Sequence, residues 1–210
     1  MANLLITSLD PQLQKQVEGA RAALDRGKPE QAIELCAAIL TVQPDCLQVR
    51  KLERAAQLKF AAIRRGLVAR LVNAVSTAPF IFNANLKLKD DPRGSLATAE
   101  RLLRRDPHSV PALNLLGQSA TALGWTETAV FAHEAASDLE PERTDLLVLL
   151  GQAYLAAGRN ADAIGAAHQA LQLDPDEFAA KGLLQHAQVA HTLARGNLDR
   201  GAANQERPVI

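Results

Sequence analysis

Histidine, cysteine and the carboxylates do much of the chemistry in proteins, and in this sequence their spacing forms no recognisable site. None of the five histidines stands four residues from another or belongs to an HExxH arrangement: His108, His133, His168, His186 and His191. Cys36 and Cys46 are spaced neither as zinc ligands nor as a CxxC pair. Asp90 and Asp91 are adjacent in a Pro-Gly turn, where a carboxylate typically caps a helix. Since the sequence also has no GxSxG, P-loop or GxGxxG motif, we expect a protein that is not an enzyme and binds no cofactor or metal.

Composition and charge exclude further classes of protein. The 210 residues are 48% apolar and 3% aromatic, which suits close packing of alanine-rich helices better than a sheet core. The net charge is zero, so no overall field attracts nucleic acid or keeps copies of the chain apart. The N-terminus lacks the features of a secretory signal, and no run of about 18 apolar residues could span a membrane. Cys36 falls on an apolar helix face, as expected of a buried free thiol in the reducing cytoplasm.

A repeat with a fixed period organises the second half of the chain. Proline recurs at equal intervals, as Pro107, Pro141 and Pro175, and this interval is called the repeat period below. The same interval relates six further pairs of residues: Leu113 with Leu147, Leu116 with Leu150, Gly117 with Gly151, Gly124 with Gly158, Ala129 with Ala163, and Ala136 with Ala170. A fixed period that holds for several residue types is typical of arrays built from one repeated supersecondary unit.

The N-terminal residues form another copy of this unit. Apolar periodicity predicts helices over about 12–26 and 29–42. The distances from Gly27 and Ala32 to Pro44 recur later in the chain, from Gly124 and Ala129 to Pro141 and from Gly158 and Ala163 to Pro175. We therefore expect this hairpin to share the fold of the later ones.

The period breaks between Pro44 and Pro107, whose separation is neither one nor two repeat periods. From residue 46 to about residue 75 the sequence has no proline and a single glycine, Gly66. This pattern predicts one long helix over 46–75, kinked at the glycine and followed by Pro79, although a hairpin over the same residues stays open.

The remaining elements follow from the same signals. After a short segment over 80–89, we expect a helix over 92–105 capped by Asp91, hairpins of 109–123 with 126–139 and 143–157 with 160–173, and a last helix over 178–194. This last helix has a polar stripe, as expected where an array ends: Lys181, Gln185, Gln188, Thr192 and Arg195.

The unit resembles the tetratricopeptide repeat. The residues that carry the resemblance are Leu147, Leu150, Gly151, Tyr154, Ala163, Ala170 and Pro175, with Ala167 where the family usually has an aromatic residue. In the unit from Val110 to Arg143, Ala120 replaces the usual Tyr and His133 replaces the usual Phe. The resemblance implies an all-α, right-handed α-solenoid of helix-turn-helix hairpins, with an irregular long helix in the N-terminal half and a C-terminal capping helix.

The resemblance also implies a concave groove lined by the first helix of each hairpin. The residues expected there are Asn114, Gln118, Thr121, Asp145, Val148, Gln152, Leu155 and His186. Side-chain amides that recur with the repeat period could hydrogen-bond an extended peptide backbone. The alternative interpretation, solvated polar residues without a ligand, stays open.

A basic segment suggests a second interaction surface. Residues 50–70 hold seven basic side chains against one acid, a local charge of +6. The residues predicted for this surface are Arg50, Lys51, Arg54, Lys59, Arg64, Arg65, Arg70, Phe80 and Phe82. A long helix with a solvated basic face is the plainer interpretation, and an acidic partner or a membrane surface would be the ligand otherwise.

The function expected from the sequence is that of a non-catalytic adaptor or scaffold that binds a protein or peptide partner in the groove. The alternatives are a peripheral membrane-surface scaffold attached through residues 60–89 and an accessory module of a longer protein. Self-association is also open. The expected organisation is an arm (1–11), one solenoid (12–196) and a disordered tail (197–210), with units over about 13–46, an irregular 47–109, 110–143 and 144–177, and the capping helix over 178–194.

Overall fold

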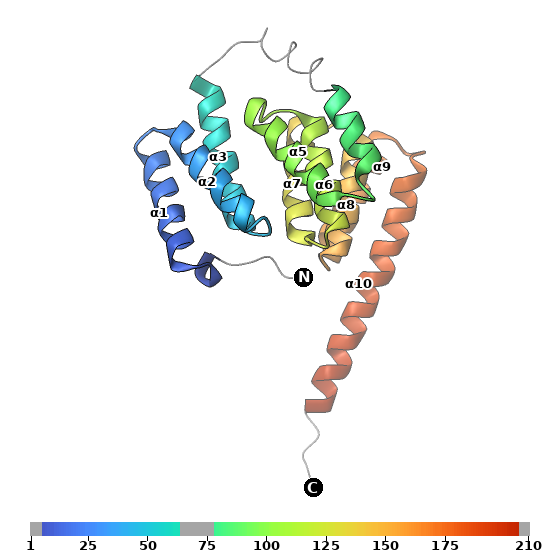
Figure 1. Cartoon of the computed structure of the whole chain (residues 1–210). Coiled ribbons are helices and arrows are strands. Elements are labelled where there is room, and N and C mark those ends of the chain that lie inside the picture. The colour runs from blue at the N-terminus through green and yellow to red at the C-terminus, as the bar shows by residue number, and fades with distance from the viewer. Residues whose placement is uncertain (1–5, 64–77, 206–210) are drawn as a thin grey trace. The chain divides into compact units, whose positions relative to one another are not determined.

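The computed structural model describes residues 6–63 and 78–205, with side chains up to residue 196 (Figure 1). Every regular element in these ranges is a helix, which confirms the predicted all-α class. The elements are η1 (Ile6–Ser8), α1 (Pro11–Asp25), α2 (Pro29–Val42), α3 (Leu47–Ile63), a helix over 78–87, α5 (Pro92–Arg105), α6 (Val110–Ala122), α7 (Thr126–Leu139), α8 (Thr144–Ala156), α9 (Asn160–Leu173) and α10 (Phe178–Gln205).

The helices group into two compact units, Met1–Ala132 and His133–Ile210, and α7 contains the boundary. Each unit is described by itself below. In the first unit α2 packs against both α1 and α3, and α5 packs against α6. In the second unit α9 packs against both α8 and α10. Neighbours in sequence are thus neighbours in space, as a helical array requires.

The second helices of the hairpins share one length, and three of them, α2, α7 and α9, share one kind of entry turn. The helices α2, α5, α7 and α9 each have 14 residues. Gly27, Gly124 and Gly158 have φ of 73°, 74° and 75°, a left-handed conformation in which a Cβ would be strained. The N–H group after each glycine bonds back to a carbonyl of the first helix, for example Arg159 N to Tyr154 O at 2.9 Å. The three glycines in register therefore make three copies of the same turn.

The predicted cap of α5 is confirmed. Asp91 is the N-cap residue, and its Oδ1 accepts a hydrogen bond from Gly94 N at 2.8 Å. A Cβ on Gly94 would lie 2.1 Å from Asp91 Oδ2, so the glycine leaves room for the capping carboxylate. Pro92 stands in the first turn, where its missing N–H costs no helical hydrogen bond.

The segment before α5 differs in part from the prediction. The described part of the long helix ends at Ile63, and residues 64–77 lie outside the described residues. Pro79 stands in the first turn of a new helix, and the short segment over 80–89, for which no helix was expected, is helical to residue 87. Ser95 Oγ donates a hydrogen bond to Ala84 O at 2.8 Å, which ties this helix to α5.

Gly151 lies against helices of two hairpins. A Cβ at this residue would lie 2.4 Å from Cδ2 of Leu183 on α10 and 3.4 Å from Cβ of Ala166 on α9. The glycine therefore admits the next hairpin's helix even more closely than its own partner helix.

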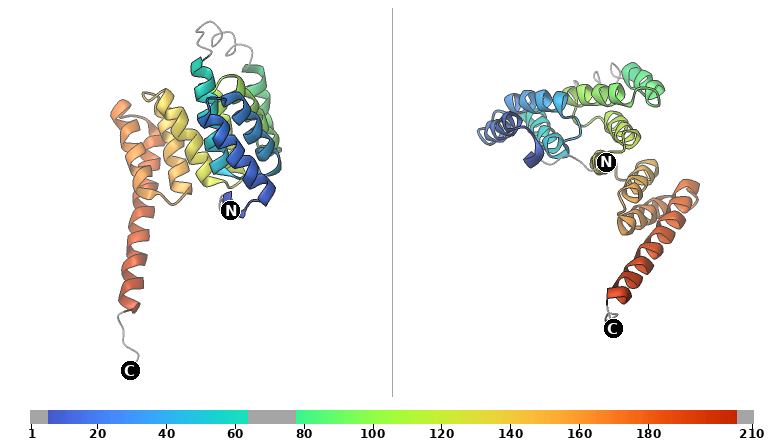
Figure 2. Two further views of the ribbon diagram at one scale, coloured as in Figure 1. Left: turned by 90° about the vertical axis from the view of Figure 1, so that its left-hand side faces the viewer. Right: turned by 60° about the horizontal axis from the view of Figure 1, so that its bottom comes forward.

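The helix α10 is longer than predicted. It continues to Gln205, where the sequence predicted an end at residue 194 and a disordered tail from 197. The physical reason is that Pro208 is the first proline after the helix start, and Gly196 and Gly201 lower helix propensity without blocking a helical hydrogen bond. The five residues of the predicted polar stripe are all exposed, as expected. Figure 2 shows α10 continuing beyond the ends of α8 and α9.

Candidate functional site

Three predicted groove residues lie on α6 in the first unit. Asn114, Gln118 and Thr121 follow one another at spacings of four and three residues, so they share a helix face. Asn114 and Gln118 are half-buried, and Thr121 is exposed. The Thr121 hydroxyl donates to Gly117 O at 3.0 Å, whereas the Asn114 Oδ1 is buried without a hydrogen-bond partner among the described residues. The amide of Asn114 thus has an acceptor that the fold itself does not use.

The other five predicted groove residues lie in the second unit, four on α8 and one on α10. Gln152 and His186 are exposed, and Leu155 is half-buried. Asp145 is exposed but engaged, since Arg143 Nε donates to its Oδ1 at 3.0 Å and Arg143 lowers its pKa. Asp145 therefore meets a ligand only as part of an ion pair.

Val148 does not belong to an accessible surface. It is 6% exposed and forms a core cluster with Leu147, Ala170 and Ala180. The prediction that Val148 lines a groove is wrong for this reason: the residue is covered by the two helices that follow α8.

The basic residues at the start of α3 are used within the first unit. Arg50 is 3% exposed, and its guanidinium donates to Glu100 Oε1 from Nε at 3.2 Å and from Nη2 at 2.5 Å. Lys51 Nζ lies 5.7 Å from the centre of the Phe131 ring, and an N–H of Arg54 donates to Pro107 O at 2.8 Å. Arg50 is therefore buried and cannot be part of an exposed docking surface, which corrects the prediction. Its acidic partner is a residue of the same chain.

The other predicted members of the basic surface have different positions. Lys59 is exposed on α3. Arg64, Arg65 and Arg70 lie outside the described residues. The buried contacts of α3 show how a basic helix docks: long cationic side chains reach α5 and the residues around it, while their apolar stems pack.

Glu53 is the least expected member of this interface. It is 3% exposed, and burial, followed by the nearby carboxylate of Glu100, raises its pKa to about 7. The cations of Arg104 and Arg50 and a hydrogen bond from Gln57 act in the opposite direction. A carboxyl group in this position titrates near neutral pH, so the interface between α3 and α5 is sensitive to protonation.

His133 is a packing residue and not an exposed ligand. It is 3% exposed, and burial lowers its pKa to about 4, which keeps the imidazole neutral at pH 7. It occupies the position where the tetratricopeptide unit usually has an aromatic side chain, so it fills a space in the core.

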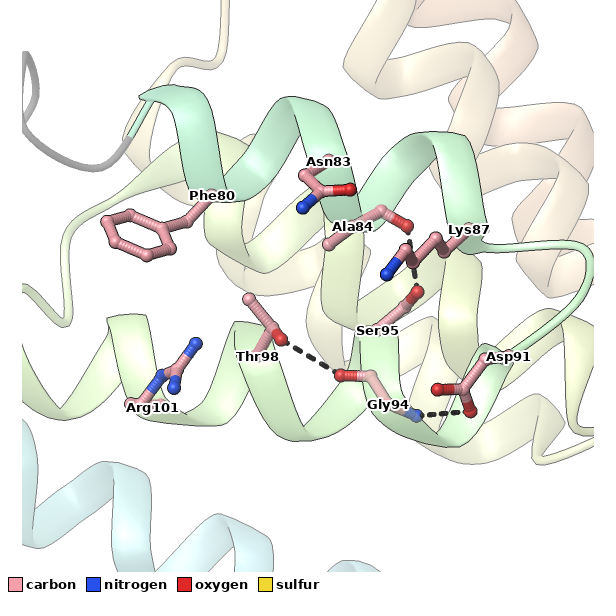
Figure 3. A pocket seen from close by; sticks show the side chains of 9 residues that line it. All are labelled: Phe80, Asn83, Ala84, Lys87, Asp91, Gly94, Ser95, Thr98 and Arg101. Atoms are coloured by element: carbon pink, nitrogen blue, oxygen red, sulfur yellow. Dashed lines mark hydrogen bonds between the residues drawn. The ribbon is translucent and has the colours of Figure 1, made fainter.

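A pocket that the sequence did not predict lies between the helix over 78–87 and α5 (Figure 3). Its volume is about 290 Å³, and it is lined by Phe80, Asn83, Ala84, Lys87, Asp91, Gly94, Ser95, Thr98 and Arg101. Arg101 lies 5.9 Å from the centre of the Phe80 ring. The Thr98 hydroxyl donates a hydrogen bond to Gly94 O at 2.9 Å, and the Ser95 hydroxyl donates one to Ala84 O at 2.8 Å. The polar groups left for a ligand are the cations of Lys87 and Arg101 and the Asn83 amide, which suit an anionic side chain.

The repeat period could have located this pocket. One repeat period before the groove residues of α6 stand Phe80, Ala84 and Lys87, which all line the pocket. The sequence predicts a partial unit near 76–109, but the groove residues expected from it begin only at Asn114.

Exposed apolar side chains lie on the same helix. Phe82 and Leu86 are each 66% exposed, and Phe80 is 51% exposed. Because Phe82 and Leu86 are four residues apart, they share one face of the helix. Ile63, at the end of α3, is 71% exposed.

The described parts of the chain contain neither a cluster of metal ligands nor a membrane-spanning helix. In residues 6–63 and 78–196, no three or more His, Cys, Asp or Glu side chains come together as metal ligands. Of the helices that the structure describes, none is both long and apolar enough to cross a membrane.

The chain is similar to one protein family and to several solved structures. Residues 144–177, which include α8 and α9, match the family model described as "Tetratricopeptide repeat". The TPR domain of P58(IPK) has 14% sequence identity, covers 87% of this chain and 56% of its own, and superposes with a TM-score of 0.50. TTC0263, a thermophilic TPR protein of Thermus thermophilus, has 17% identity over 84% of this chain and 99% of its own, with a TM-score of 0.49. The TPR2AB domain of yeast Sti1, solved in complex with pHSP90, has 13% identity over 84% of this chain and 69% of its own, with a TM-score of 0.47.

No curated protein matches the sequence. At such low identity, a likeness to a solved structure shows the fold alone, and the P58(IPK) domain shows it here.

Proposed function

Because the chain is a tetratricopeptide repeat protein, we propose that it is a non-catalytic adaptor that binds a segment of a partner polypeptide along the first helices of its hairpins. Helical-repeat folds of this kind typically serve as binding scaffolds, since stacked units present extended surfaces. The side chains that recur on these helices with the repeat period are Gln118, Gln152 and His186. They are polar, half-exposed or exposed, and suited to hydrogen-bond a peptide backbone.

The observation that carries this proposal is the buried amide oxygen of Asn114. A buried acceptor without a partner costs about 1–3 kcal/mol, so a position of this kind is commonly completed by water or by a ligand. Gln118 lies one helical turn further on the same face of α6. The Asn114 side chain as a whole is half-buried, so rotation of its amide would turn this oxygen toward a peptide N–H lying on the same face, and the next backbone group would reach Gln118.

The pocket beside α5 supports an acidic residue in the partner. Lys87 and Arg101 are its two cations, and the one carboxylate of its lining, Asp91, already caps α5. The lining therefore holds two cations against one carboxylate, and a partner Asp or Glu would meet a net positive charge there. The proposed ligand is an extended segment with at least one acidic side chain.

The test is a binding measurement on amide-truncated variants. Peptides of about 12 residues are selected from a random library on the wild-type protein, and the best is titrated by calorimetry into wild type and Gln118→Ala/Gln152→Ala. Two lost hydrogen bonds of about 0.5–1.5 kcal/mol each predict a 5- to 150-fold weaker complex at about 1.4 kcal/mol per tenfold. The matched control is Gln169→Ala/Gln172→Ala, since both residues are exposed glutamines on the second helix α9. Equal affinity of wild type and the first variant, or an equal loss in the control, would place the binding site elsewhere.

The exposed apolar residues on the helix over 78–87 favour a second candidate function, attachment to a membrane surface. Phe82 and Leu86 form an apolar face near Lys87 and Lys89, the arrangement of an interfacial helix. Vesicles of phosphatidylserine and phosphatidylcholine should then sediment with wild type and fail to sediment with Phe82→Ser/Leu86→Ser. If wild type stays in the supernatant, this second candidate is rejected.

The absence of catalysis and the cytoplasmic location belong to the same proposal. The buried, unbridged thiols of Cys36 and Cys46 support a reducing compartment. Burial raises the pKa of Cys36 to about 12, so this thiol is a poor nucleophile. Turnover of any substrate that a single groove substitution abolishes would contradict the non-catalytic assignment.

A further inference from the structure

The helix α10 has an apolar stripe that nothing in its own unit covers. Phe178, Val189 and Leu193 are large apolar side chains that are 87%, 55% and 63% exposed. Gly182 stands between the first two. The successive spacings of four, seven and four positions place all four on one face of a helix with about 3.6 residues per turn.

This stripe faces away from the rest of the second unit. The residues of α10 that are buried against its neighbours are Ala180, Leu183 and Ala187. At about 3.6 residues per turn, these three lie on roughly the opposite side of the helix from the apolar stripe. Exposed apolar side chains that share one helix face can form an interaction surface.

The repeat explains why the stripe is open. The helices α6, α8 and α10 begin at Val110, Thr144 and Phe178, each one repeat period after the last, so α10 stands in the place of a first helix. On α8, the residue one repeat period before Gly182 is Val148, which the following helices bury. Among the described residues no helix follows α10, and its equivalent face stays uncovered.

We propose that this face binds the same face of a second copy of the chain, with the two α10 helices antiparallel. The spacing of four, seven and four positions is symmetric about the point between Gln185 and His186. A two-fold axis at this point therefore places each residue of the stripe opposite another residue of the stripe in the second copy. Phe178 of each copy then packs on Leu193 of the other, and Val189 fills the space beside Gly182. An interface that pairs a surface with itself is the kind that a two-fold dimer requires.

Charge supports this arrangement. The same axis places Arg195 of one copy opposite Asp176 of the other, since the two residues stand equally far from the centre of the stripe along the sequence. Arg195 is exposed, and the Asp176 side chain is 99% exposed at the start of the helix. Antiparallel helices also bring opposite ends of their dipoles together. The chain has no net charge, so no long-range repulsion opposes the association.

The dimer is tested by sedimentation equilibrium of the full chain between about 1 and 200 µM. Val189→Glu/Leu193→Glu should raise the dimer dissociation constant at least about 100-fold, because four carboxylates would be buried in one apolar contact. The matched control is Gln188→Glu/Thr192→Glu, which adds the same charge to exposed positions one residue earlier on the same helix. The control should dimerise as wild type does, and circular dichroism should show equal helix content in all three proteins.

A charge reversal tests the orientation of the helices. Arg195→Asp places a carboxylate opposite Asp176 at both ends of the dimer interface. The dimer dissociation constant should rise about 2- to 30-fold. Adding Asp176→Arg to the same chain should restore the affinity, which a parallel pair would not do. A wild-type chain that stays monomeric at about 200 µM overturns the proposal, as does a dimer that the stripe substitutions leave unchanged. Failure of the reversal to rescue would overturn the antiparallel arrangement.

Discussion

Substitution of Arg50 by methionine should destabilise the protein far more than an exposed arginine would. Methionine keeps the apolar stem and removes the guanidinium, which donates to Glu100 Oε1 and, at 2.8 Å, to Pro44 O. Breaking a buried ion pair from one side typically costs about 3–5 kcal/mol, because the remaining charge stays buried. The Glu100 side chain is 15% exposed and can reach some water, so we expect the lower end of this range, about 3 kcal/mol.

The assay is urea denaturation followed by circular dichroism at pH 7.5. Arg143→Met is the matched control, because its side chain is 47% exposed and pairs with Glu140 and Asp145 at the surface. Exposed pairs contribute about 0.2–1 kcal/mol, so this variant should unfold close to wild type. In Arg50→Met/Glu100→Leu both charges are gone, and part of the lost stability should return. If Arg50→Met costs no more than Arg143→Met, the buried contact between α3 and α5 is not as described.

Two further predictions concern packing and pH. Gly151→Leu should destabilise the protein by about 1–3 kcal/mol, because a Cβ at this position already meets Leu183. Gly165→Ala should stabilise it by about 0.5–1 kcal/mol, because no atom lies within 4 Å of the added Cβ and alanine favours the helix. Thermal unfolding compares the two variants, and overlapping melting curves would contradict the packing described for Gly151. Because the pKa of Glu53 is raised, the stability that its protonated form contributes is complete below about pH 4.5 and is lost as pH rises through about 7. Glu53→Gln stays neutral, so its free energy of unfolding in urea should exceed that of wild type by an amount that grows across this pH range. The lowered pKa of His133 has the opposite effect, since the stability that the neutral imidazole contributes is complete above about pH 6.5 and is lost as pH falls through about 4. The variant His133→Phe should therefore resist acid unfolding better than wild type. For either residue, a stability difference between variant and wild type that does not change with pH would refute the assignment.

The parts of the fold that depend on local geometry could be predicted from the sequence. The turn glycines are one example, because glycine adopts the φ near +74° of each tight turn without the strain of a Cβ, and the period therefore shows in the residue type. The Asp91 cap and the polar stripe of α10 are others, since each rests on hydrogen bonding or solvation within one helix.

What depends on contacts between distant residues could not be predicted. Arg50 and Glu100 are 50 residues apart, and nothing in the charge pattern around Arg50 shows that one acid elsewhere in the chain removes it from the surface. Val148 reads as a groove position in its own helix and is buried only because α9 and α10 cover it. The same holds for Gly151, whose close neighbour Leu183 belongs to the helix after next.

The most direct test of the adaptor proposal is site-specific photo-crosslinking of the partner. A benzophenone amino acid replaces Gln118 or Gln152 on the first helices, or Gln169 or Gln172 on the second helix α9, and each protein is irradiated with the selected peptide. We expect crosslinked peptide from residues 118 and 152 and none above background from residues 169 and 172. Crosslinks that arise equally at all four positions, or only on α9, would contradict binding along the first helices.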